Sequence, residues 1–350
     1  MYRILFVDEV TGKPYDGNTL ENKPQGGTES TVTRIAEGLV RRGHRVCIAQ
    51  LGRADRAIVN GVEVTPFTDI GDFVPTHVVC VWSARRLDEI SKRWPRARGF
   101  EYYQDVPVPG EPFVMDTEAL IGNNGTAILV SAWQREQWIN CMRAFGYAGD
   151  ENRVVYIYNP IPDDLQPDAT PVDPDKFIYF SIPDKGLRET LTLFSRFPHY
   201  PQLRDVRLYV ASPGYREMGF ELPTDRVVYL GKLPWKDVIQ EVRSSFMVLD
   251  CNVRRPETFG LVHAEADAVG TPWIGGYLGA NEEVRYHPDE LMDMSDPDAV
   301  IQRIIDWKEN GRLQVRGREE FRLSNVLNEW EKLLAEEWEG PNPERSVVHP

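Results

Sequence analysis

Short apolar, β-prone segments alternate with amphipathic segments along most of the chain, and this alternation constrains the fold more than any other feature. In the first half, strands are predicted at residues 3–8, 45–49, 77–82 and 127–130, with helices around 32–40 and at 132–144. In the second half, strands are predicted at 177–182, 206–211, 227–230, 246–251 and 273–275, with helices at 187–197, 235–244, 260–269, 299–309 and 326–338. Such alternation is typical of parallel sheets that carry helices on both faces. The sequence therefore predicts an α/β protein.

A segment rich in proline and aspartate separates the two alternating halves. The 350 residues exceed the length of about 250–300 residues at which a single hydrophobic core stops growing, so we expect two domains. Residues 159–176 contain five prolines and five aspartates, a composition that favours a stiff linker. The predicted organisation is a domain at 1–158, a linker at 159–176, a second domain at 177–322, a helix at 323–339 and a disordered tail at 340–350.

Charge and cysteine content narrow the classes of partner and compartment. The net charge is −14, and it is uneven, because residues 1–158 carry 18 basic and 20 acidic side chains whereas residues 159–350 carry 22 and 34. Such a surface repels a nucleic-acid backbone, so nucleic acid is not expected as a partner. The four cysteines lie far apart, which is typical of reduced thiols in a cytoplasmic protein: Cys47, Cys80, Cys141 and Cys251. The amino terminus is interpreted as a first strand and not as a signal peptide.

One segment departs from this acidic balance. Residues 85–98 contain only two acidic side chains, Asp88 and Glu89, against six basic ones. The basic residues are Arg85, Arg86, Lys92, Arg93, Arg96 and Arg98. We interpret the segment as a solvated helix face, and the alternative is a weak peripheral contact with a membrane or with an acceptor.

Two glutamates eight positions apart, Glu257 and Glu265, form the most informative motif. Glu257 lies in a loop after a predicted strand, and a predicted helix opens near Gly260. The free amides and the positive dipole of a helix amino terminus suit a phosphate or diphosphate. Glu265 lies about 7–8 Å farther along the helix axis, so the spacing fits two different parts of a nucleotide-sugar. Spacing alone leaves open the alternative that both glutamates are only partners of the helix dipole.

The stretch from Glu257 to Pro272 resembles the E-x(7)-E motif of the retaining nucleotide-sugar glycosyltransferases of the GT-B fold, in the group related to family 4. The residues in register are Glu257, Phe259, Gly260, Glu265, Ala266, Ala268, Gly270 and Pro272, whereas Thr258 replaces the usual glycine. Further stretches that resemble the family are 130–135, 158–160, 180–187, 227–232 and 275–284. The resemblance implies two Rossmann-like parallel-sheet domains that face a cleft, with the C-terminal helix crossing back to the first domain.

The resemblance also implies a role for each matched residue. Glu257 would lie beside the donor sugar and Lys185 would neutralise the diphosphate, so both are predicted to be catalytic, with Asp105 as a third catalytic residue at the cleft. Glu265 would hold the ribose hydroxyls. The full set of predicted donor-binding residues is Gly26, Gly27, Lys185, Phe259, Gly260, Leu261 and Glu265.

Two positions depart from the family pattern. Phe180 stands where many relatives carry an arginine, so Lys185 is expected to act alone or with another cation such as Arg188. Gln104 stands where a histidine is common, and glutamine does not transfer protons. His263 is predicted to be packed or exposed and not catalytic.

Two Asp-x-Asp strings are not interpreted as metal sites. Residues 173–175 fall in the predicted linker, and Asp296 is predicted to cap a helix whose first residue is Pro297. We therefore expect the protein to work without a metal ion.

The sequence thus predicts a glycosyltransferase that moves a sugar from a nucleoside-diphosphate donor with retention of configuration and with no resident cofactor. The expected acceptor is a glycan, a lipid-linked sugar or a small molecule; a modified nucleobase stays open as an alternative that the net charge of −14 disfavours. A nucleotide-sugar epimerase on the same fold and a non-catalytic protein that binds nucleotide-sugars or glycans are the alternatives. A dinucleotide oxidoreductase is disfavoured, because no G-x-G-x-x-G follows the first strand.

Overall fold

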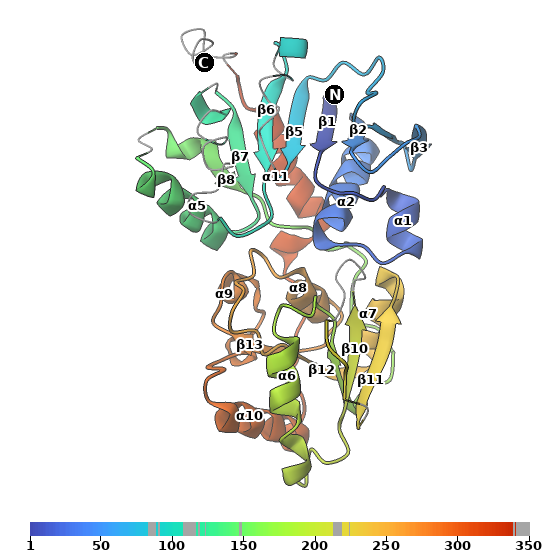
Figure 1. Ribbon diagram of the computed structural model, residues 1–350, viewed down its shortest axis with the longest axis vertical. Helices are drawn as coiled ribbons and strands as arrows, with labels where there is room; N and C mark the ends of the chain where they lie inside the picture. The colour runs from blue at the N-terminus through green and yellow to red at the C-terminus, as the bar shows by residue number, and fades with distance from the viewer. Residues whose placement is uncertain are drawn as a thin grey trace. The chain divides into compact units, whose positions relative to one another are not determined.

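The computed structural model consists of two α/β units (Figure 1). It describes residues 1–82, 89, 92–107, 117, 120–122, 124–146, 149–212, 219–223, 225–338 and 340. The first unit comprises residues 1–18, 28–160 and 323–350, and the second comprises residues 19–27 and 161–322. The predicted tail after residue 340 and the basic residues Arg85 and Arg86 lie outside the described residues.

An eight-stranded sheet forms the centre of the first unit, in the order β3-β4-β2-β1-β5-β6-β7-β8. Neighbouring strands run parallel except in the β3–β4 pair, which is antiparallel. The strands are β1 (Arg3–Asp8), β2 (Arg45–Gln50), β3 (Ala57–Val59), β4 (Val62–Pro66), β5 (His77–Val81), β6 (Arg98–Tyr102), β7 (Thr126–Leu129) and β8 (Val154–Tyr156). The helices are α1 (Gly17–Asn22), which extends into the second unit, α2 (Gly27–Arg41), α5 (Ala132–Ala144), η1 (Glu151–Arg153) and α11 (Leu323–Ala335).

Helices pack on both faces of this sheet. Alternate residues of β1 point to opposite sides, so Leu5 joins a buried cluster with Trp138 of α5, whereas Phe6 contacts Trp330 of α11 at 5.9 Å between ring centroids. A Cβ on Gly38 of α2 would lie 2.5 Å from Leu327 of α11, so these two helices pack closely side by side. The C-terminal helix thus belongs to the first unit, which confirms the predicted crossing back.

A fully parallel six-stranded sheet forms the centre of the second unit, in the order β11-β10-β9-β12-β13-β14. The strands are β9 (Asp173–Tyr179), β10 (Arg207–Ser212), β11 (Val227–Lys232), β12 (Ser245–Leu249), β13 (Trp273–Gly276) and β14 (Leu291–Met292). The helices are α6 (Leu187–Phe194), η2 (Phe197–His199), α7 (Trp235–Arg243), α8 (Leu261–Ala268), α9 (Asn281–Val284), η3 (Pro288–Glu290), α10 (Pro297–Asn310) and η4 (Glu319–Phe321). Apolar residues of α6 and α10 bury one cluster against β9, β10 and β12.

Two sequence interpretations are corrected by these elements. Strand β9 begins at Asp173, so the string 173–175 is strand and not linker. Its Pro174 lies where the pairing of β9 with β12 is irregular, and this is where a strand tolerates a residue without an N–H. Arg98 is not part of a solvated face, because it is buried in β6, and its Nη1 donates to Leu333 O at 2.9 Å.

Other expectations are confirmed locally. Asp296 caps α10, and its side chain accepts a hydrogen bond from Ala299 N, with Pro297 as the first helical residue. All four cysteines are free thiols. In the part of the chain that the structure describes, no helix is both long and apolar enough to cross a bilayer.

Candidate active site

The loop after β9 carries Lys185 and is held in a fixed shape. The Tyr179 hydroxyl lies 2.6 Å from Ile182 O and 3.0 Å from Lys185 O. Gly186 follows with φ +93°, and a Cβ there would lie 2.5 Å from the Cα of Asn252. Only glycine permits both this backbone conformation and this close approach. The loop of Lys185 is therefore pressed against the loop that follows β12.

The loop after β12 carries Glu257 and is equally fixed. Asn252 Oδ1 accepts hydrogen bonds from Arg254 N and Arg255 N, both at 3.1 Å. The backbone of Glu257 pairs with Gly279 in an isolated parallel bridge, and its carbonyl accepts from Ala280 N at 2.8 Å. Glu257 is thereby positioned from the loop before it and from the loop after β13.

Lys185 and Glu257 form an ion pair, with 2.7 Å between Nζ and Oε2. The Glu257 side chain is 7% exposed, whereas the Lys185 side chain is 25% exposed. Among the described residues, the second carboxylate oxygen of Glu257, Oε1, is buried and has no hydrogen-bond partner. Two of the three predicted catalytic residues, Lys185 and Glu257, therefore meet directly although they are 72 positions apart.

Helix α8 begins immediately after this pair. Gly260 precedes it with φ +95° and ψ +58°, and no side chain in the described part of the chain caps the helix. Phe259 is buried, with its ring edge-on to Phe321 at 5.0 Å. A Cβ on Gly27 would lie 3.1 Å from Leu261 Cδ1. The opening of α8 is thus a rigid amide-bearing turn beside the Lys185–Glu257 pair, which suits an anion or hydroxyl groups.

Glu265 lies just over one turn into α8. It is oriented by Trp235, the first residue of α7. The indole Nε1 of Trp235 donates to Glu265 Oε1 at 2.7 Å, and Glu265 is buried. Sequence reasoning missed Trp235, because nothing within its own helix indicates a partner 30 residues away.

His263 lies beneath the opening of α8 and is fully buried. Its Nε2 lies 2.9 Å from Asp250 Oδ2, and its ring stacks on Trp273 with 3.9 Å between centroids. A Cβ on Gly260 would lie 3.1 Å from His263 Nδ1 and 3.7 Å from Asn281 Oδ1. Of the two environments expected for His263, packed or exposed, the structure has the packed one, and the ring supports the turn at Gly260.

Two buried carboxyl groups, Asp267 and Glu290, join α8 to the segment after β13. Burial raises the pKa of both, and the neighbouring charge of Glu290 raises the pKa of Asp267 further. Glu290 Oε2 accepts from Tyr286 N and His287 N at 2.9 Å each, which favours its charged form. Burial and the neighbouring carboxylate thus raise the pKa of Asp267 and favour its protonated form.

This pair predicts a pH dependence of stability. Because the folded protein holds a proton that the unfolded chain releases, the pair's contribution to the free energy of unfolding is fully present below the ordinary carboxyl pKa. It is lost as the pH rises through the raised pKa. Asp267→Asn keeps a hydrogen-bond donor at this position but has no proton to titrate. The free energy of unfolding of this variant, minus that of the parent, should therefore increase from pH 5 to pH 9. Urea unfolding followed by tryptophan fluorescence checks this, and a constant difference between variant and parent would contradict it.

The predicted site residues fall into two groups. Lys185, Glu257, Phe259, Gly260, Leu261 and Glu265 gather around the opening of α8, and Gly26 and Gly27 belong to the same unit. Asp105 belongs to the first unit, where it is exposed, and its Oδ1 accepts from Val106 N at 2.8 Å. Phe180 is buried, and the Arg188 guanidinium lies over the Phe220 ring at 4.1 Å.

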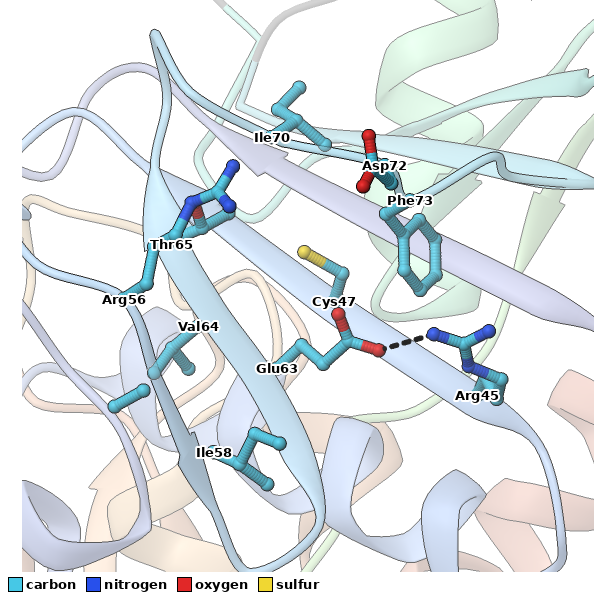
Figure 2. A pocket seen from close by; sticks show the side chains of 11 residues that line it. Arg45, Cys47, Arg56, Ile58, Glu63, Val64, Thr65, Ile70, Asp72 and Phe73 are labelled. Carbon is cyan, nitrogen blue, oxygen red and sulfur yellow. Dashed lines mark hydrogen bonds and ion pairs between the residues drawn. The ribbon is translucent and has the colours of Figure 1, made fainter.

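A cavity of about 500 Å³ lies in the first unit between β2, β3, β4 and residues 70–73 (Figure 2). Its two arginines are engaged in ion pairs: Arg45 with Glu63 at 2.8 Å, and Arg56 with Asp69 at 2.6 Å. Burial raises the pKa of the Cys47 thiol to about 12, so this cysteine is not an activated nucleophile. We therefore place the candidate active site at the opening of α8 and not at this cavity.

Comparison with known proteins identifies the fold. No family model matches the chain. Over 121 residues, which are 31% of this chain and 30% of the relative, the chain is 33% identical to N-acetyl-alpha-D-glucosaminyl L-malate synthase of Bacillus anthracis. The alignment thus spans under a third of that curated relative.

Solved structures match over nearly the whole chain. Sucrose-phosphate synthase from Thermosynechococcus elongatus has a TM-score of 0.70 at 17% identity, covering 95% of this chain and 98% of that one. AviGT4, a glycosyltransferase involved in avilamycin A biosynthesis, has a TM-score of 0.61 at 15% identity, with coverages of 95% and 96%. An alpha-glucosyltransferase in complex with UDP and DNA has a TM-score of 0.60 at 12% identity, with coverages of 96% and 100%.

Two parallel-sheet α/β units together with these neighbours define the GT-B fold. The chain has the fold of the GT-B glycosyltransferases, as its sequence predicted.

Proposed function

We propose that this protein is a glycosyltransferase that takes a sugar from a nucleoside-diphosphate donor and retains the anomeric configuration. The observation that carries the proposal is the ion pair of Lys185 and Glu257 beside the opening of α8, with Glu265 farther along the same helix. The glycosyltransferases among the structural neighbours and the curated relative support the same class.

Each group at α8 has a defined task in this proposal. Lys185 stabilises the negative charge that develops on the leaving diphosphate, because its side chain is more exposed to solvent than that of Glu257. Glu257 accepts hydrogen bonds from sugar hydroxyls through the oxygen that has no partner in the described residues. Glu265, oriented by Trp235, accepts from the ribose hydroxyls.

Retention of configuration is proposed to need no protein nucleophile. The leaving phosphate, held by Lys185 and by the amides at the opening of α8, accepts the proton of the incoming acceptor hydroxyl on the same face of the sugar. Because Lys185 supplies the positive charge at the diphosphate, we propose that transfer proceeds without a metal ion and without a resident cofactor. The acceptor is proposed to be a glycan, a lipid-linked sugar or a small molecule, since a net charge of −14 disfavours a polyanion.

A donor panel tests the proposal. UDP-, GDP- and ADP-sugars are screened by thermal shift, and those that stabilise the protein are incubated with acceptor mixtures, with and without EDTA, before mass spectrometry. We expect one nucleotide class to raise the melting temperature and its sugar to appear on an acceptor in both conditions. Release of an epimerised sugar without an acceptor would indicate the epimerase, and binding without turnover would indicate a non-catalytic protein. Either result would overturn the proposed function.

A further inference from the structure

Lys185 and Glu257 bind each other through Nζ and Oε2, although the proposed function assigns each of them to a different part of the donor. Their backbones are fixed by separate contacts: the loop of Lys185 by the Tyr179 hydroxyl, and Glu257 by Gly279 and Ala280. The pair is therefore preformed, and a donor that engages the Lys185 ammonium must compete with the Glu257 carboxylate for it.

We propose that Lys185 changes partners during the reaction cycle, and that its return to Glu257 promotes release of the nucleoside-diphosphate product. This inference rests on the proposed function. In one state Lys185 pairs with Glu257, as in the structure, at 2.7 Å. In the donor complex Lys185 contacts the diphosphate, and sugar hydroxyls hydrogen-bond to Glu257 in its place.

Burial of Glu257 makes the exchange asymmetric between substrate and product. At 7% exposure, its carboxylate needs hydrogen-bond donors from the protein or from the ligand, because water scarcely reaches it. An intact donor brings sugar hydroxyls. After transfer the sugar has left, so Glu257 regains stabilisation only by recapturing Lys185, which weakens the hold on the diphosphate.

The composition of the loop after β9 makes the exchange depend on a single cation, Lys185. Between Phe180 and Gly186 the sequence contains no basic residue other than Lys185. The buried Phe180 provides no charge, and the Arg188 guanidinium lies over Phe220. A change in the partner of Lys185 therefore changes the positive charge that this loop presents to a diphosphate.

Isothermal titration calorimetry on the full chain tests the exchange with inorganic pyrophosphate, UDP, GDP and ADP as probes. Glu257→Gln keeps the size of the side chain and removes the charge that competes for Lys185. We expect this variant to bind pyrophosphate and the matching nucleotide about 3- to 10-fold more tightly than the parent, as the loss of one partly exposed ion pair implies. Lys185→Ala should bind them at least about tenfold more weakly, because it loses a charge-assisted contact.

Two further variants make the test specific. Glu241→Gln removes the same charge from another lysine–glutamate pair of this unit, that of Lys176 and Glu241, and should leave diphosphate affinity unchanged. In the Lys185→Ala background, Glu257→Gln should change the affinity less than about twofold, because no cation remains for which the carboxylate and the diphosphate compete. Circular dichroism confirms that each variant is folded, and Lys185→Gln replaces Lys185→Ala if the latter is not.

The outcomes separate this inference from the proposed function. Unchanged or weaker diphosphate binding by Glu257→Gln overturns the exchange, even if sugar transfer is observed. The same holds if the tighter binding persists without Lys185, or if neither parent nor variant binds any of the four probes. Absence of sugar transfer, together with the expected affinity changes, overturns the proposed function and its product-release step, and leaves standing only the competition of Glu257 and a diphosphate for Lys185.

Discussion

Glu257→Gln should lower kcat about 100-fold, with little effect on the donor KM, because it removes a charge that acts mainly in the transition state. Positive charge develops on the sugar as the glycosidic bond breaks, and the proposed position of Glu257 is beside that sugar. Glu265→Gln should instead raise the donor KM and leave kcat within a few-fold. The ribose keeps its shape through the reaction, so a contact with it is equally strong in both states.

Steady-state initial rates on both variants check this division, with product removed by a coupled phosphatase so that tighter diphosphate binding does not obscure kcat. Each substitution keeps the size of the side chain, and the glutamine at position 265 retains an oxygen that accepts from the Trp235 indole. An unchanged kcat for Glu257→Gln, or one common kinetic pattern for both variants, would contradict the assignment of the two carboxylates.

Much of the fold could be predicted because local patterns and tertiary burial agree. The apolar positions of α2 recur every three or four residues; Val32, Ile35, Ala36 and Leu39 are buried and Val40 is half-buried. Helix α5 covers the predicted range of 132–144. The hydrophobic pattern does not identify a strand in which charged residues are buried. Strand β6 includes Arg98 and Glu101, and both are buried because α11 and Thr117, distant in sequence, supply their partners.

The composition of residues 159–176 gave a wrong prediction for residues 173–175, for a related reason. Prolines and aspartates up to Asp175 predicted an irregular segment. In the structure, Lys176 is a buried residue of β9 and is paired with Glu241 and Ser244 of the same unit. Pairing with the neighbouring strands outweighs the weak strand propensity of residues 173–175.

The local structure around the predicted site residues could be predicted from the sequence, but their tertiary contacts could not. The motif placed Glu257, Gly260 and Glu265 in one loop and helix, where the structure has them. The ion pair of Glu257 with Lys185 and the bond from Trp235 to Glu265 join residues 72 and 30 positions apart. Such contacts depend on which strands are neighbours in the sheet, and spacing within a motif carries no information about that.

Gly279 is the position at which the smallest substitution should do the most damage to this site. Its φ is +69°, and a Cβ there would lie 2.3 Å from the carbonyl oxygen of Glu257 and 2.5 Å from its nitrogen. These are backbone atoms that cannot rotate away. Gly279→Ala must therefore displace Glu257 or the turn before α9, and it adds the strain of a non-glycine residue in the left-handed region, about 1–3 kcal/mol by itself.

We expect Gly279→Ala to reduce sugar transfer more than about 100-fold, since displacement by about 1 Å is enough to lose positioning of this kind. It should also lower the free energy of unfolding of the second unit by about 3 kcal/mol or more, because strain and steric overlap add. Gly231→Ala is the matched control: φ is +80° in the same unit, but a Cβ there has no atom within 4 Å among the described residues. It should show the strain cost alone, with transfer retained. Urea unfolding and transfer assays on both variants decide the matter, and equal effects of the two substitutions would show that contact with Glu257 is not what requires glycine at position 279.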